Sequence, residues 1–311
     1  MFSFTLKCKC AMKDHRMTTH PDRWIARLAF TVAATTGCLS LAACRLDAAS
    51  AEGTISTTIT EARSLVLTNE NGSVEIVKDA AVTGVQVTAK IRCVAESREL
   101  AEARVKVTNI LVERGSGGRT GLTVVFPSRA PGAVRVQMGG VGSDDGASLV
   151  VRAASLDGIE VKTSNGSITS GAFTGPARFA TSNGSIQVDG HDGSVELDTS
   201  NGSITALNVG TPLIADTSNG RVEVSLAPNA TGNVKIDTSN GRVELQLPAA
   251  WQGTVDAGTS NGSIETNVMS GTSSRVEIGH GKATIAVGDG TRAKATIDTS
   301  NARVTIRSAN K

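Results

Sequence analysis

Carboxylates at repeated positions are the side chains of this sequence that could bind a metal. Four Asp-Thr-Ser-Asn quartets place one aspartate before the same polar turn. If the quartets stack, their carboxylates form a ladder that could hold calcium, a hard cation that takes six or more oxygen ligands. Each quartet has only one carboxylate, so the preferred alternative is a row of solvated turn residues in which asparagine stacks on asparagine, and we predict no metal site. The four aspartates are Asp198, Asp216, Asp237 and Asp298.

The histidines do not form a catalytic constellation. His191 and His280 are far apart in the chain, so a shared metal site or a Ser-His-Asp triad is not expected. No Cys-His pair or paired carboxylates stand out either. We therefore predict no catalytic residue, no cofactor and a protein that is not an enzyme.

The tetrapeptide Thr-Ser-Asn-Gly recurs at nearly constant spacing. With His280 in a degenerate copy and Ala302 replacing glycine after Asn301, successive asparagine positions are 18, 18, 18, 21, 21, 19 and 21 residues apart. This period indicates one small supersecondary unit copied many times. Asn and Gly adopt positive φ at little cost, so the chain is predicted to turn at each copy. The predicted turn pairs are Asn165-Gly166, Asn183-Gly184, Asn201-Gly202, Asn219-Gly220, Asn240-Gly241 and Asn261-Gly262.

Short apolar alternations flank every turn and predict strands, as in Val234 and Ile236 before the turn at Asn240. Two all-β folds fit this pattern. In a parallel β-solenoid each copy of roughly 20 residues is one rung, and equivalent residues stack. In an antiparallel meander each Asn-Gly closes a two-residue hairpin. The solenoid is favoured, because a hairpin requires only Asn-Gly whereas stacking also explains the recurring Thr and Ser.

The N-terminus has the features of an export signal. Arg23 and Arg27 precede an apolar run, 28–41, which has the length of a signal-peptide core. The run ends in Leu-Ala-Ala-Cys at 41–44, which resembles the bacterial lipobox. The resemblance implies a signal peptide at 1–43 and a lipidated Cys44. The alternative is an ordinary secretory signal with Cys44 nearby, and Met17 is a plausible start in place of Met1.

A tether is predicted at 44–62, and one β-solenoid domain at 63–311. Its irregular N-terminal part, 63–150, contains an early copy of the repeat at 65–76. That part also has strands at 85–93, 105–113 and 122–126, a helix at 96–104, and a long exposed acidic loop at 128–146. The regular repeats are predicted at 151–311. Solenoid ends need caps, and we expect the helix at one end and the last copy, with Arg303, Arg307 and Lys311, at the other.

Composition excludes some partners. Removing residues 1–44 leaves 25 basic and 27 acidic residues, so there is no electrostatic case for nucleic acid binding. Cys93 is the one cysteine left after Cys44, and its place in an alternating strand predicts a buried small hydrophobe. Trp251 is predicted to pack a loop onto the solenoid, with an exposed contact for a partner as the alternative.

The Thr-Ser-Asn-Gly-Ser-Ile and Asp-Thr-Ser-Asn-Gly-Arg-Val segments, after a lipobox and a mixed β segment, resemble a bacterial envelope family. Its members are grouped as putative adhesins with a domain of unknown function. The resemblance covers roughly 65–306 and implies a right-handed β-solenoid displayed on the cell envelope. It brings no catalytic residues.

The expected function is therefore a lipid-anchored, non-catalytic adhesion, binding or structural module of the cell envelope. Its partners would be the membrane, through the lipid, and an unknown protein or surface. Arg45, in place of the aspartate that keeps enteric lipoproteins at the inner membrane, favours the outer membrane. The alternatives are a periplasm-facing accessory or envelope-sensing protein and a β-helix enzyme that acts on polysaccharide.

Overall fold

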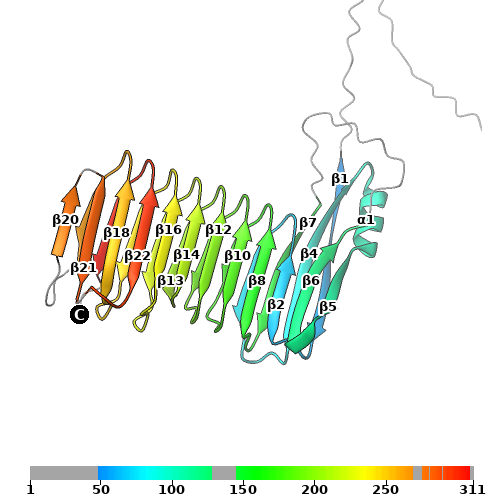
Figure 1. Ribbon diagram of the computed structural model, residues 1–311. Helices are drawn as coiled ribbons and strands as arrows, with labels where there is room; N and C mark the ends of the chain where they lie inside the picture. The colour runs from blue at the N-terminus through cyan, green and yellow to red at the C-terminus, as the bar shows by residue number, and fades with distance from the viewer. Residues whose placement is uncertain (1–47, 128–144, 269–274, 280, 289, 309–311) are drawn as a thin grey trace, which may run out of the picture. The chain divides into compact units, whose positions relative to one another are not determined.

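The computed structural model describes residues 48–127, 145–268, 275–279, 281–288 and 290–308 (Figure 1). Within these ranges the strands form two sheets, one of 11 strands (sheet A) and one of 12 (sheet B). The predicted signal peptide, Cys44 and most of the predicted acidic loop lie outside the described residues. No helix of the described chain is long and apolar enough to cross a bilayer.

Sheet A has this spatial order: β1 (Ala49–Ile59), β4 (Val85–Ala95), β7 (Gly146–Ala153), β3 (Val74–Lys78), β9 (Ile168–Ser170), β11 (Ile186–Asp189), β13 (Ile204–Val209), β15 (Val222–Leu226), β17 (Val243–Leu247), β23 (Val304–Ser308) and β19 (Ile264–Asn267). Sheet B has this order: β20 (Arg275–Gly279), β21 (Lys282–Val287), β18 (Gly253–Thr259), β22 (Lys294–Thr299), β16 (Val234–Thr238), β14 (Leu213–Thr217), β12 (Val195–Thr199), β10 (Ala177–Thr181), β8 (Gly158–Thr163), β2 (Ser64–Thr68), β6 (Arg119–Val125) and β5 (Asn109–Arg114).

Each Thr-Ser-Asn-Gly turn carries the chain from a strand of sheet B to a strand of sheet A. β16, for example, leads through the turn at Asn240 into β17. Equivalent strands of successive copies pair in parallel, so that Thr217 lies opposite Thr238 and Val222 opposite Val243. The predicted β-solenoid is thereby confirmed, and the hairpin meander is excluded because the two strands of one copy belong to different sheets.

Alternation along the strands builds the core between the sheets. In β16, Val234, Ile236 and Thr238 are buried, while Lys235 is exposed. The same pattern recurs from rung to rung, so Phe179, which is fully buried, pairs in register with Leu197 of the next rung. A period of two therefore gives each sheet one apolar face toward its partner.

The N-terminal part corrects two predictions. The predicted tether is wrong for most of its length, because β1 pairs with β4 over 11 residue pairs, from Ala49 opposite Ala95 to Ile59 opposite Val85. Its alternating Ser, Thr and Ile suit a strand, which the Ala-rich, polar composition obscured. The predicted strand at 105–113 begins later, since 105–107 belong to α1 (Arg98–Val107) and the strand itself is β5.

Helix α1 begins where capping chemistry requires. The Ser97 Oγ accepts a hydrogen bond from the Leu100 N–H at 3.3 Å, satisfying one of the free donors of the first turn. The helix packs against β1 and β4 and buries Ala101 completely. It therefore covers apolar residues at the N-terminal edge of sheet A, the position expected of a cap.

The order of the rungs departs from the order of the sequence at both ends (Figure 1). β2 and β3, the early copy, lie between β6/β7 and β8/β9. The last copy, β22 and β23, lies between β16/β17 and β18/β19. The prediction that the last copy caps the array is therefore wrong. Arg307 lies in the interior strand β23 and Arg303 directly precedes it, and the hairpin β20–β21 extends sheet B instead.

Candidate functional site

The predicted turn asparagines form a continuous hydrogen-bonded ladder on the exposed edge of the solenoid. Each side-chain amide donates to the Oδ1 of the asparagine on the neighbouring rung, with N–O distances between 2.7 Å and 3.0 Å. The ladder runs through Asn71, Asn165, Asn183, Asn201, Asn219, Asn240, Asn301 and Asn261. At its start, Asn71 donates to the Asp145 carbonyl at 3.0 Å.

The threonine and glycine of each turn have separate roles. Thr199 is buried, and its hydroxyl donates to the Gly184 carbonyl of the preceding rung at 2.9 Å. The six predicted turn glycines do not have positive φ, so the expectation that glycine is used here for a positive φ is wrong. A Cβ at Gly202 would instead fall inside the carbonyl oxygen of Gly184. Glycine is required because neighbouring rungs approach closely at the turn.

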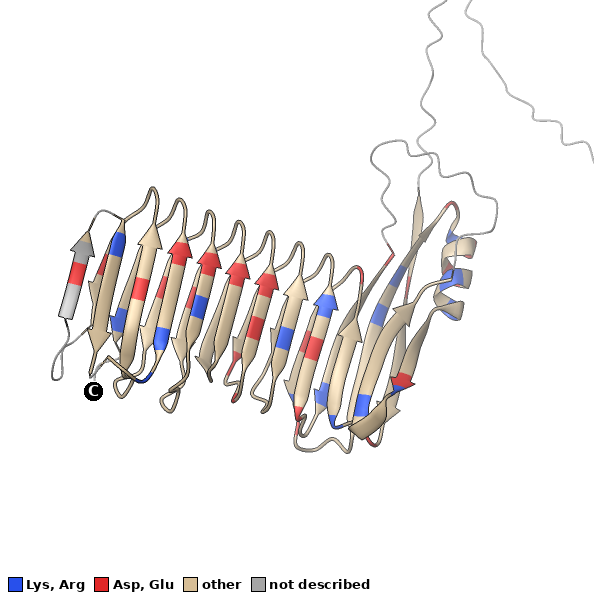
Figure 2. Ribbon diagram, in the orientation of Figure 1, with Lys and Arg blue, Asp and Glu red and all other residues tan. Residues whose placement is uncertain are grey.

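The four quartet aspartates lie in one row on the outer face of sheet B. Asp198, Asp216, Asp237 and Asp298 are register partners on successive strands, so the predicted ladder of carboxylates exists (Figure 2). Burial, followed by the carboxylates of Asp237 and Asp198, raises the pKa of Asp216. Lys235 Nζ is 2.6 Å from Asp237 Oδ2 and offsets part of the row's charge. Among the described residues, no group of three or more His, Cys, Asp or Glu is arranged to hold a metal ion.

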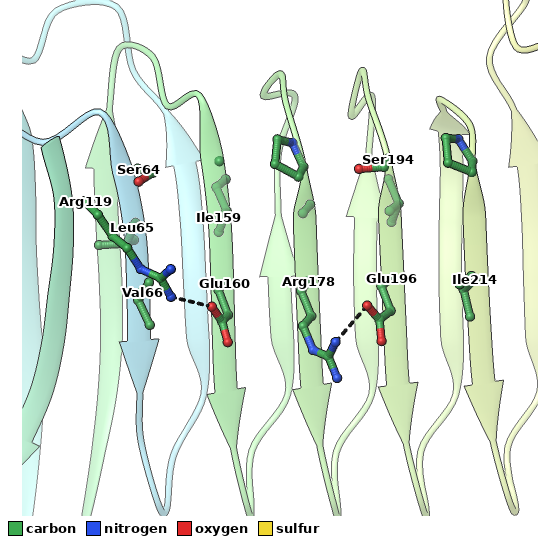
Figure 3. Close-up of a pocket in the computed structure, with 15 residues that line it drawn as sticks. Ser64, Leu65, Val66, Arg119, Ile159, Glu160, Arg178, Ser194, Glu196 and Ile214 are labelled. Carbon is green, nitrogen blue, oxygen red and sulfur yellow. Dashed lines mark hydrogen bonds and ion pairs between the residues drawn. The ribbon is translucent and has the colours of Figure 1, made fainter. Parts of the chain in front are cut away.

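A shallow groove of about 350 Å³ lies on the same face, over the N-terminal half of sheet B (Figure 3). Two ion pairs cross it. Arg119 on β6 reaches past β2 to Glu160 on β8 at 3.0 Å, and Arg178 on β10 pairs with Glu196 on β12 at 2.9 Å. These side chains are about half exposed, so the pairs contribute little to stability and leave polar groups open to a partner.

The apolar part of the groove is made by aliphatic side chains and proline rings. Val66 and Ile214 lie in the same cross-strand row as Glu160, Arg178 and Glu196. Ile214 is 43% exposed and is one of five large hydrophobic side chains that are exposed among the described residues. Pro176 and Pro212 line the groove beside this row. The groove thus combines an apolar floor with paired charges.

The sequence pattern missed a buried ion pair at Asp145. The predicted exposed acidic loop is wrong for this residue, because Asp145 pairs with Arg104 of α1 and both side chains are largely buried. Asp145 Oδ1 also accepts from the Val94 N–H at 2.8 Å. No local signal identifies this pair, since Arg104 and Asp145 are 41 residues apart. The Arg104–Asp145 pair connects the helix to β4 and to the residue that precedes β7.

The two predicted packing residues are buried as expected. Trp251 is 2% exposed and belongs to the core, and Cys93 is fully buried. His191 is also buried, and its Nε2 donates to the Gly175 carbonyl oxygen at 2.8 Å. Burial lowers the pKa of His191. His280 lies outside the described residues.

A protein-family model, described as Toastrack DUF4097, matches residues 100–307, about two thirds of the chain. The chain belongs to the Toastrack family. The match begins within α1, yet β2 and β3 continue both sheets of this Toastrack domain and its asparagine ladder. Comparison with curated proteins gave no match.

Solved structures resemble the Toastrack domain distantly. A putative adhesin from Bacteroides fragilis is 9% identical, with 83% of this chain and 97% of that chain covered and a TM-score of 0.38. A putative cell adhesion protein from Clostridium sporogenes is 13% identical, with 83% and 100% covered and a TM-score of 0.33. A putative lipid binding protein from Parabacteroides distasonis is 12% identical, with 83% and 97% covered and a TM-score of 0.37. At these values the likeness carries no argument about function.

Proposed function

We propose that this chain is a lipid-anchored protein of the bacterial cell envelope whose Toastrack domain binds a partner without catalysing a reaction. The observation that carries the proposal is the groove on the outer face of sheet B. Its charged side chains pair with each other, and its floor presents Val66, Ile214 and two proline rings to solvent. Such a surface suits contact with a partner that has an apolar surface and a few polar groups.

The chemistry of the described residues supports a binding role. The buried His191 donates to a backbone carbonyl through Nε2, and within the described part of the chain its Nδ1 has no hydrogen-bond partner, so no hydroxyl or thiol is paired with the ring. The quartet carboxylates lie on an open face, one per rung, and Asp237 is paired with Lys235. A hydrolytic site would need a positioned acid and base around one reacting atom, as the scheme for a polysaccharide-acting enzyme requires.

The envelope location rests on the leader. The lipobox-like 41–44 segment supports export and a thioether-linked diacylglycerol on Cys44. One acyl chain holds a protein on a membrane only marginally, whereas two or more give stable anchoring. Arg45 supports the outer membrane as the destination, and on that membrane we place the binding face on the cell surface, with a periplasm-facing domain as the alternative.

A photo-crosslinking residue at position 214 tests the groove directly. Ile214 is 43% exposed, so its replacement should leave the fold intact. We expect a discrete adduct in cells after irradiation, lost when Arg178→Ala and Glu196→Ala are added. The matched control is the same residue at Glu265, on β19 of sheet A, where no such adduct should form. Equal adducts at both positions, or none at position 214, would contradict a binding role for the groove.

A further inference from the structure

Helix α1 presents an apolar stripe to solvent. Leu100, Ala103 and Val107 are exposed and lie at i, i+3 and i+7, on one face of the helix. Leu100 is 53% exposed and Val107 is 63% exposed. They are two of the five large hydrophobic side chains that are exposed among the described residues, and both are on one ten-residue helix. We call Leu100, Ala103 and Val107 the α1 stripe.

The stripe cannot turn inward, because the rest of the helix is fixed. Ala101 is completely buried, and Val105 lies against Gly53 of β1, where the absence of a Cβ leaves room for it. Arg104 donates to the Val94 carbonyl at 2.6 Å and pairs with Asp145. The buried ion pair, the glycine contact and the cap at Ser97 together set the rotation of α1 about its axis.

The stripe also lies close to the point where the chain leaves the domain for Cys44. Ala49, the first residue of β1, is paired with Ala95, and α1 begins three residues later at Arg98. Five residue steps separate Cys44 from Ala49, a reach of at most roughly 18 Å even when fully extended. Because β1 takes up most of the predicted tether, the proposed lipid on Cys44 would hold this end of the domain near the membrane surface.

We infer that the α1 stripe contacts the membrane leaflet that carries the Cys44 lipid and orients the domain on it. The inference rests on the proposed lipid anchor. Apolar residues of an amphipathic helix bury about 5–10 Å into the boundary between headgroups and acyl chains. Two large side chains are too few to recruit a soluble protein, but an anchored domain needs only a contact that selects one orientation.

Polarity-sensitive fluorescence tests the contact in the lipidated full-length protein, reconstituted into phosphatidylethanolamine and phosphatidylglycerol vesicles. A dye is attached at Leu100→Cys or Val107→Cys, and at Glu265→Cys on β19 as the matched control. Cys93 is fully buried and should stay unlabelled. We expect a blue-shifted emission and quenching by doxyl-labelled lipid at positions 100 and 107, with neither change at position 265.

Mass spectrometry of the same preparation separates the two claims. A Cys44 peptide without lipid would overturn the anchor and the inference together. A lipidated Cys44 with equal, water-like emission at all three positions would overturn the inference alone. A dye at position 100 that is shielded but not quenched by doxyl lipid would indicate cover by protein, a second copy included, and would also overturn it.

Discussion

At the scale of single residues, the turn glycines are needed for close approach between rungs. Gly202→Ala would place a methyl group inside the Gly184 carbonyl oxygen, and the rungs would have to separate. We expect the free energy of unfolding to fall by about 1–3 kcal/mol. The matched control is Gly279→Ala, since a Cβ there meets no described atom within 4 Å. Urea denaturation of both variants checks this, and equal midpoints would contradict the close-approach account.

The same scale includes a pH effect at His191. Burial lowers its pKa below the ordinary value near 6.5, so the unfolded chain binds the proton more tightly than the folded one. The contribution of His191 to stability is therefore complete above pH 6.5 and is lost as the pH falls toward the lowered value. We expect the difference in unfolding free energy between wild type and His191→Gln to shift in favour of the variant on acidification. A difference independent of pH from 8 to 5 would contradict this.

At the scale of elements, the Arg104–Asp145 pair holds α1 on β4. Asp145→Ala would leave the Arg104 guanidinium buried without its partner, with an expected loss of about 3–5 kcal/mol. Arg98→Ala is the matched control, because Arg98 and Glu102 form an exposed i,i+4 pair worth about 0.3–0.5 kcal/mol. Guanidinium denaturation measures both. If both variants lost a similar amount of unfolding free energy, the buried Arg104–Asp145 pair would not be what holds the helix on β4.

Local pattern predicted most of the regular elements but not their spatial order. Period-two alternation around the Asn-Gly pairs predicts strands such as β16 and β17, and stacked rungs follow from the recurring Thr and Ser. The insertion of β22 between β16 and β18 is a long-range pairing choice. The quartets ending in Asn240 and Asn301 have the same sequence, Asp-Thr-Ser-Asn. The local pattern therefore does not show which copy lies next to which in the sheet.

Only part of the candidate site could be predicted from the sequence. The row of quartet aspartates follows from the period, because equivalent residues of stacked rungs share a face. The ion pair of Arg119 with Glu160 does not, because it depends on β6 lying beside β2 and β2 beside β8. Pattern also missed the strand at 49–59, whose small and polar residues match a tether in composition while their alternation suits an edge strand.

At the scale of the whole molecule, we propose a protein with an export signal, a lipid on Cys44 and a Toastrack domain that binds a partner through its groove. The partners that the domain can bind depend on which side of the envelope it faces. A domain on the cell surface can bind partners from outside, whereas one that faces the periplasm would serve an envelope complex or sense envelope state.

Protease treatment of intact cells tests this central claim most directly. We expect wild-type protein to be lost from intact cells, and the Cys44→Ala variant to be released into soluble fractions because it lacks the lipid. A periplasmic marker protein should stay intact in the same cells. Wild-type protein that survives the protease while lysed cells lose it would contradict surface display and place the binding groove inside the envelope.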